Sequence, residues 1–149
     1  AHHKLLQHQV GGLDAPAQQS RVHADVLDEE NIYESAKWLK DMALNLGCVV
    51  VCSGKIDVVT DGKEVNLISN GCDMLSRITG TGCMLNVAIA TFLASYSPLL
   101  ACIKATCYYE VAAEKTKCEG PGTFHMHFMD EIYKLTSFDE SLFKIEVLE

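Results

Sequence analysis

The chain has 149 residues, the size of one domain, and 48% hydrophobic with 21% charged residues is typical of a globular protein rather than a disordered one. Its net charge of -8 argues against a nucleic-acid partner, because nucleic-acid binding needs clustered Lys and Arg. No run reaches the roughly 20 apolar residues that cross a bilayer, so we expect no membrane partner.

The first 27 residues carry little pattern and are predicted to be loop. A helix is predicted from residue 28, with Asp28 as its cap and Gly47 as its end. Apolar residues recur along one helical face at Ile32, Ala36, Leu39, Ala43 and Leu46.

The next segment alternates strand and turn signals. Residues 48–52 form a continuous apolar run that predicts a strand covered on both faces. Residues 56–60 and 63–68 predict a hairpin, and Asp61-Gly62 between them favours a two-residue type I′ turn.

Three helices are predicted in the second half. Gly80-Thr81-Gly82 leads into a helix over 83–95, which is apolar nearly all round and so is expected to be buried. Ser97-Pro98 caps a helix reaching residue 114. Gly120-Pro121-Gly122 is expected to break the chain before a last helix over 124–135, and the tail over 136–149 carries little pattern. This order implies an α/β fold with helices layered on a sheet.

The glycine loop is the strongest candidate site. Two glycines before a helix start align backbone N–H groups and suit a phosphate group. Cys83 follows in the first turn, where the helix field favours the thiolate as a base or nucleophile. The alternatives are an ordinary tight turn and a cysteine that only fills space at a helix start.

Seven cysteines lie in this chain, an odd number. Four of them sit among aliphatic residues, which predicts reduced core thiols and a cytoplasmic protein. These four are Cys48, Cys52, Cys102 and Cys107.

Four segments together resemble the hydroxyethylthiazole kinase family of the ribokinase-like superfamily. They are residues 47–57, Thr60-Asp61-Gly62-Lys63, Asn70-Gly71 with residues 78–85, and Gly120-Pro121-Gly122-Thr123-Phe124. Gly-Thr-Gly-Cys is specific in this context, since most ribokinase-like relatives have aspartate at the cysteine position. The resemblance covers residues 28–135 as a kinase-domain portion, between the unpatterned segment 1–27 and the tail 136–149.

The resemblance implies a three-layer fold, with a central sheet between helices. It implies transfer of the γ-phosphoryl group of ATP, with Mg²⁺, to the hydroxyl of 4-methyl-5-(2-hydroxyethyl)thiazole in thiamine biosynthesis or salvage. It also implies a homotrimer with sites between subunits. Site residues follow by position: Cys83 matches the catalytic base, Gly80, Thr81 and Gly82 match the anion hole and substrate contact, and Ser53 and Gly54 match the ATP contact.

Chains of this family are longer at the N terminus, so the chain is expected to lack N-terminal elements, including metal-linked residues. The resemblance assigns no magnesium-positioning residue to this chain. One alternative is therefore a non-catalytic or truncated nucleotide-binding module. Another is a cysteine hydrolase pairing Cys83 with His125 or His127, and a third is a metal site of Cys118, His125 and His127.

Overall fold

The computed structural model describes residues 20–23, 31–134 and 139–148. Five strands form one sheet in the order β1-β2-β3-β4-β5. Strand β1 runs parallel to β2, and the remaining neighbours are antiparallel. The strands are β1 (Ser20–His23), β2 (Val50–Ser53), β3 (Asp57–Thr60), β4 (Val65–Ile68) and β5 (Ile145–Leu148).

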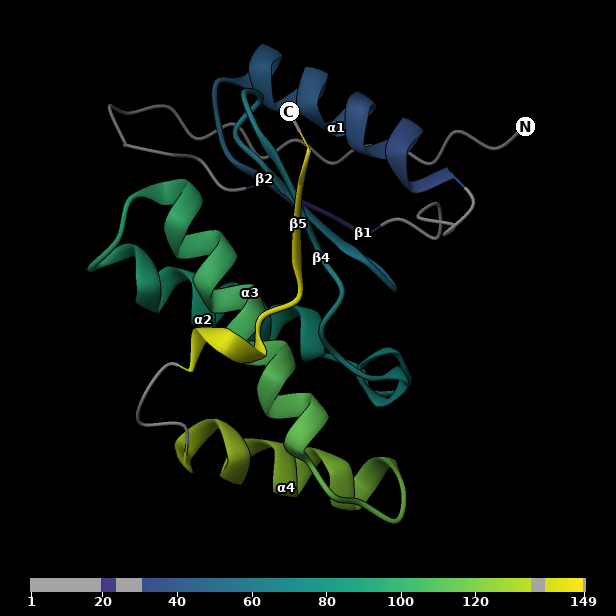
Figure 1. Ribbon diagram of the computed structural model, residues 1–149. Coiled ribbons are helices and arrows are strands. Elements are labelled where there is room, and N and C mark those ends of the chain that lie inside the picture. The colour runs from purple at the N-terminus through teal and green to yellow at the C-terminus, as the bar shows by residue number, and fades with distance from the viewer. Residues whose placement is uncertain (1–19, 24–30, 135–138, 149) are drawn as a thin grey trace.

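Helices lie on both faces of this sheet (Figure 1). On one face lies α1 (Ile32–Leu46), and on the other lie α2 (Thr81–Leu93) and α3 (Pro98–Lys115), with α4 (Pro121–Lys134) against α3. Two short 3-10 helices are η2 (Asp73–Arg77) and η3 (Glu140–Leu142). The expected α/β fold with a central sheet between helices is confirmed.

Strands β2, β3 and β4 are buried on both faces, because successive side chains point to opposite sides and each side packs against helices. Val50 and Cys52 of β2 pack with α1, whereas Val51 between them packs with α2 and α3. The continuous apolar run predicted as a doubly covered strand therefore behaves as expected, although β2 begins at Val50 rather than at residue 48.

Helix α1 buries the predicted apolar face and ends at the predicted residue, Gly47. Gly47 ends it in the left-handed region at φ 62°, and its N–H bonds back to the carbonyl groups of Ala43 and Leu44. Leu46 on that face is 44% exposed, because it lies in the last turn beyond the sheet contact. The predicted cap, Asp28, lies outside the described residues, and the helix begins at Ile32 after Asn31.

The predicted hairpin is present as β3 and β4, but the prediction of a two-residue turn between them is wrong. Thr60 pairs with Val65, so the connection spans residues 61–64. The Asp61 carboxylate holds this loop by accepting from the N–H groups of Lys63 at 2.8 Å and Glu64 at 3.1 Å. Gly62 is required because a Cβ there would lie 2.7 Å from the backbone nitrogen of Leu44 in α1.

Helix α2 is less buried than predicted. Only one side of it meets the core, through Gly82, Leu85 and Ile89, and Val87 on the opposite side is 68% exposed. An apolar groove of about 590 Å³ runs along this exposed side. Its walls come from α2, α3 and α4 and include Met84, Phe92, Tyr96, Tyr108 and Met129. No other described segment covers it.

The last helix starts earlier than predicted. The Gly120-Pro121-Gly122 segment does not break the chain but opens α4, with Phe124 N–H bonding to the carbonyl of Gly120 at 2.9 Å. The Thr123 hydroxyl accepts from the N–H of Glu119 at 3.0 Å and so caps this helix. Proline suits a first helical turn, where its missing N–H is not needed.

Two strands, β1 and β5, fall in segments with no clear pattern in the sequence. Among the described residues, no helix is both long enough and apolar enough to span a bilayer. Of the four predicted core thiols, Cys52, Cys102 and Cys107 are buried, whereas Cys48 is half-buried. Burial raises the pKa of Cys102 to about 11 and that of Cys107 to about 12, so both thiols stay protonated in the core.

Candidate active site at the start of α2

A cavity of about 450 Å³ lies where α2 begins and where β2 ends. The residues around it come from four separate parts of the chain. Its lining includes residues from the end of β2 to the start of β3 (Ser53, Gly54, Lys55 and Asp57), from η2 (Leu75 and Ser76), from the start of α2 (Thr81 and Gly82) and from α3 (Tyr109 and Glu110). Segments more than 50 positions apart in sequence therefore share one cavity.

The start of α2 presents unused backbone N–H groups. The first bond inside the helix runs from the N–H of Met84 to the carbonyl of Gly80 at 3.0 Å. The N–H groups of Thr81, Gly82 and Cys83 therefore precede the helical bonding pattern. Together with the positive end of the helix dipole, they form a place for an anionic group.

The glycine loop reaches this geometry through a single left-handed residue. Gly80 has φ 98°, which a residue with a Cβ adopts only under strain. Gly82 lies inside the helix and has no such φ, so the sequence pattern contains one conformational requirement rather than two. Gly82 is instead buried within the first turn of α2.

Side-chain hydrogen bonds fasten the loop on both sides. The Thr81 hydroxyl donates to the carbonyl of Leu75 at 2.9 Å, which ties the loop to η2. The Tyr109 hydroxyl donates to the carbonyl of Thr81 at 2.7 Å, which ties it to α3. The Thr81 side chain is therefore used within the protein, and its backbone N–H is the part that remains for a ligand.

The turn after β2 is held by a carboxylate. Asp57 Oδ1 accepts from the N–H of Gly54 at 2.8 Å. Ser53 is half-buried at the end of β2, so its hydroxyl belongs to the edge of the cavity. Asp57 itself is only 2% exposed.

Glu110 brings a second carboxyl to the same cavity. It is 6% exposed, although it is charged in an ordinary environment. Burial raises its pKa well above the usual value, and the neighbouring charge of Asp57 and a side-chain hydrogen bond with Asp57 raise it further.

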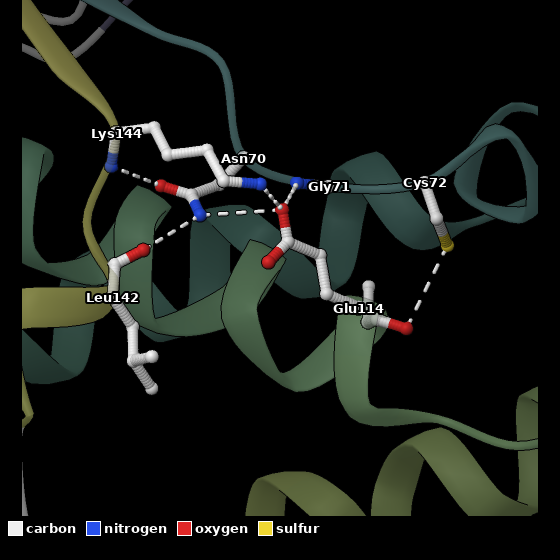
Figure 2. Close-up of polar contacts among 7 residues, drawn as sticks. Asn70, Gly71, Cys72, Glu114, Leu142 and Lys144 are labelled. Carbon is white, nitrogen blue, oxygen red and sulfur yellow. Dashed lines mark hydrogen bonds and ion pairs between the residues drawn. The ribbon is translucent and has the colours of Figure 1, made fainter.

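The loop that enters the site from β4 is anchored by a polar cluster (Figure 2). Asn70 is buried, donates to the carbonyl of Leu142 at 3.0 Å and accepts from the N–H of Lys144 at 2.7 Å. The Glu114 carboxylate accepts from the N–H of Gly71 at 3.0 Å. The cluster thereby joins three segments: the loop after β4, the end of α3 and the chain before β5.

The family model described as "Hydroxyethylthiazole kinase family" matches residues 12–138 of this chain. The chain belongs to this family.

Two curated relatives named hydroxyethylthiazole kinase come from Pyrococcus furiosus and Desulfitobacterium hafniense. The chain is 40% identical over 117 residues to a hydroxyethylthiazole kinase of Pyrococcus furiosus, a match covering 74% of this chain and 44% of the relative. It is 38% identical over 123 residues to the enzyme of that name from Desulfitobacterium hafniense, covering 79% and 44%. A solved structure of the hydroxyethylthiazole kinase protein from Pyrococcus horikoshii OT3 matches with a TM-score of 0.73 and 31% identity, covering 81% of this chain and 49% of that one.

The chain thus spans less than half the length of the family members it matches.

The structure brings together four of the predicted site residues around one cavity: Ser53, Gly54, Thr81 and Gly82. Gly80 precedes them as the left-handed cap of α2. Cys83 is exposed in the first turn of α2, next to the cavity residue Gly82 but outside the lining itself.

The two alternatives that use histidine gain no support. His125 and His127 lie on α4, outside the cavity lining, and His127 Nδ1 is 2.7 Å from the carbonyl oxygen of Lys117. No group of three or more His, Cys, Asp or Glu side chains among the described residues could hold a metal ion, which leaves out the proposed set with Cys118.

Sequence reasoning missed Tyr109 and Glu110 as parts of the site. Both stand in the middle of an apolar helix, 28 or more positions after Thr81. The only signal was chemical: a glutamate with valine and two alanines directly after it is unusual in a buried segment.

Proposed function

We propose that the protein containing this chain is a hydroxyethylthiazole kinase. It would transfer the γ-phosphoryl group of ATP to the hydroxyl of 4-methyl-5-(2-hydroxyethyl)thiazole. Family membership supports this activity, and so does the cavity that places the N–H groups at the start of α2 opposite the Ser53-Gly54 turn. The observation that carries the proposal is this pairing of an anion-binding helix start with a second polar turn.

Roles follow from position in the cavity. The N–H groups of residues 81–83 would hold the transferring phosphoryl group, whose charge grows during transfer. The Ser53 hydroxyl and the Gly54 turn would contact the phosphates of ATP. Cys83 would accept the proton of the thiazole alcohol, because its side chain is exposed in the first turn of the same helix.

Mg²⁺ is proposed as the ion that accompanies ATP. The described residues do not form a set of ligands for it, because no group of three candidate ligands occurs among them. Glu110, with its raised pKa, is protonated more readily than a metal-binding carboxylate should be.

We also propose that the protein assembles as a homotrimer. The exposed apolar groove along α2, with Val87 68% and Met129 49% exposed, supports a contact with another subunit. Light scattering on the full-length protein should give a mass of three subunits. A fully active monomer would contradict this assembly.

The decisive experiment measures ADP release with ATP, Mg²⁺ and hydroxyethylthiazole on the full-length protein. ADP release that requires the thiazole is the expected result. An alcohol lacking the thiazole ring is the matched control substrate. Nucleotide binding without turnover would instead indicate a binding module, and ADP release that ignores the thiazole would indicate another acceptor.

A further inference from the structure

The Glu114 carboxylate is the meeting point of the polar cluster in Figure 2. Its Oε1 atom accepts hydrogen bonds from the Gly71 N–H at 3.0 Å, from Asn70 Nδ2 at 3.3 Å and from Lys144 Nζ at 2.8 Å. The first two donors lie in the loop after β4, and the third lies in the chain before β5. One oxygen atom of α3 therefore holds two segments that lie 74 positions apart in the sequence.

The bond from Gly71 fixes the start of the segment 71–80, which leads from β4 to α2. Gly71 has φ 106°, and a glycine has a wide choice of backbone conformations. A hydrogen bond to a carboxylate is stronger than one to a neutral acceptor, so Glu114 restricts Gly71 to one of them. Cys72 follows, and its Sγ donates to the carbonyl of Ala113 at 3.7 Å. Two successive residues of the segment are therefore attached to the same turn of α3.

The far end of the segment is attached to α3 as well. The Thr81 hydroxyl donates to the carbonyl of Leu75 at 2.9 Å, and the Thr81 carbonyl accepts from the Tyr109 hydroxyl at 2.7 Å. Tyr109 and Glu114 lie less than two turns apart in α3. A short stretch of one helix therefore holds both ends of the segment.

This segment forms a wall of the candidate active site. Leu75 and Ser76 within it line the cavity, as do Thr81 and Gly82 directly after it. Glu114 does not line the cavity, and its side chain is 27% exposed. The carboxylate can therefore act on the cavity only through the segment that it holds.

We propose that Glu114 is a positioning residue for phosphoryl transfer, which fixes the segment 71–80 on α3 and so keeps the N–H groups of residues 81–83 directed at the cavity. The inference rests on the proposed function, because it assigns those N–H groups to the transferring phosphoryl group. Charge on that group grows during transfer, so displaced N–H groups cost more in the transition state than in bound ATP. Loss of the Glu114 carboxylate should therefore lower kcat much more than it raises KM for ATP.

The kinetic test uses three substitutions of Glu114 in the full-length protein. Glu114→Ala removes the acceptor, Glu114→Gln keeps an oxygen of the same reach for the Gly71 N–H, and Glu114→Asp keeps the charge on a shorter side chain. A displacement of about 1 Å can cost on the order of 100-fold, so we expect Glu114→Ala to lower kcat by about 10- to 100-fold and to change KM for ATP by less than about 3-fold. Glu114→Gln should be the fastest of the three variants, because it alone keeps the bond to Gly71.

Glu131→Ala is the matched control. Glu131 lies in α4, accepts from Lys134 Nζ at 3.0 Å and has a side chain 24% exposed, so it resembles the ion pair of Glu114 with Lys144. It lines neither the cavity nor the apolar groove. Its loss should leave both kcat and KM at the values of the wild type.

Amide hydrogen exchange supplies a readout that needs no activity. The N–H groups of Gly71, Leu75 and Met84 are bonded within this part of the structure, to Glu114, Cys72 and Gly80 respectively. In Glu114→Ala they should exchange faster than in the wild type by about 10-fold, while the amides of α1 keep their rates. Glu131→Ala should leave all of these rates unchanged.

The outcomes separate this role from a contribution to stability alone. Wild-type kcat in folded Glu114→Ala overturns the positioning role, and so does a lower kcat without faster exchange in the segment. If Glu114→Ala does not fold, the other two variants decide: Glu114→Gln faster than Glu114→Asp supports the role, and the reverse order contradicts it. A full-length wild type that phosphorylates no thiazole counts against the proposed function, and the exchange rates still decide whether Glu114 holds the segment.

Discussion

The Tyr109 hydroxyl donates a hydrogen bond of 2.7 Å to the carbonyl of Thr81, and this bond links the middle of α3 to the first turn of α2. The Tyr109 ring also packs edge-on against Phe128 of α4, with 4.8 Å between ring centroids. One side chain therefore connects the glycine loop to two helices that lie far from it in the sequence.

Tyr109→Phe should separate these two functions of the residue. The ring contact with Phe128 stays, while the bond to Thr81 is lost. We expect a stability loss of about 0.5–1.5 kcal/mol in urea unfolding, together with lower turnover, because the loop loses its support from α3.

Tyr108→Phe is the matched control for that variant. Tyr108 donates to the carbonyl of Ile132 at 2.7 Å, on the side of α3 facing the apolar groove. Its loss should lower stability by a similar amount and leave turnover unchanged. If the two variants have equal kinetics, the Tyr109 bond contributes to stability only.

A second prediction concerns the left-handed cap of α2. Gly80→Ala meets no steric obstacle, since no atom lies within 4 Å of the added Cβ, but it forces alanine to φ 98°. We expect a stability loss of about 1–2 kcal/mol and reduced phosphoryl transfer, because the N–H groups of residues 81–83 lose their alignment.

Gly122→Ala is the control, since a Cβ there is equally free of contacts and the residue lies within α4 at an ordinary φ. Alanine in a helix is favourable, so stability should stay level or rise by up to about 1 kcal/mol. Equal losses in the two variants would show that φ at position 80 is not the controlling factor.

The elements with a strong burial pattern were the ones predictable from the sequence. Helix α1 was predictable because its face of Ile32, Ala36, Leu39 and Ala43 is buried against the sheet. Strand β5 was not, because it is an edge strand whose Ile145 and Val147 stay exposed and so leave no contrast with their polar neighbours. The burial of α2 was overestimated, since composition alone does not tell which side of an apolar helix is covered.

The residues of the candidate site also fall into those that were predictable from the sequence and those that were not. Gly80 was predictable because its left-handed φ favours glycine, and the Ser53-Gly54 turn was predictable because it ends the apolar run of β2. Tyr109 and Glu110 reach the cavity only through the packing of α3 on α2 and β3, which no local pattern encodes. The hairpin loop also depended on a tertiary contact, that of Gly62 with α1.

A third prediction tests the polar cluster around Asn70. Asn70→Ala removes the donor to Leu142 and the acceptor for Lys144, and it leaves those backbone groups without their partner. We expect a loss of about 1–3 kcal/mol in the free energy of unfolding. Proteolysis should also cut near residues 142–144 more readily, because the segment before β5 is released.

Lys144→Ala gives the contrast within the same cluster. Its ammonium group is exposed and lies 2.8 Å from Glu114 Oε1, so an ion pair of this kind is worth less than about 1 kcal/mol. Comparable losses for the two variants would mean that the buried amide is not what holds the cluster together.

The last prediction concerns Cys83. Its side chain is exposed in the first turn of α2, beside Gly82 in the cavity wall, where the proposed function needs a base for the thiazole alcohol. Cys83→Ala should lower turnover by about 10²- to 10⁴-fold, the usual contribution of general base catalysis, while ATP affinity changes little because the backbone N–H groups remain. Cys83→Ser should also be slow, since a hydroxyl is a far weaker base than a thiolate. Cys83→Asp should keep activity and extend it to lower pH, because a carboxyl is ionised where a thiol is not and the helix start favours negative charge.

The control for Cys83 is Cys72, a second exposed cysteine, which lies outside the helix. The Cys72→Ala variant should turn over normally. A covalent intermediate on Cys83 with an inactive aspartate variant would point to a nucleophile instead, and wild-type turnover in Cys83→Ala would reduce the residue to a packing role.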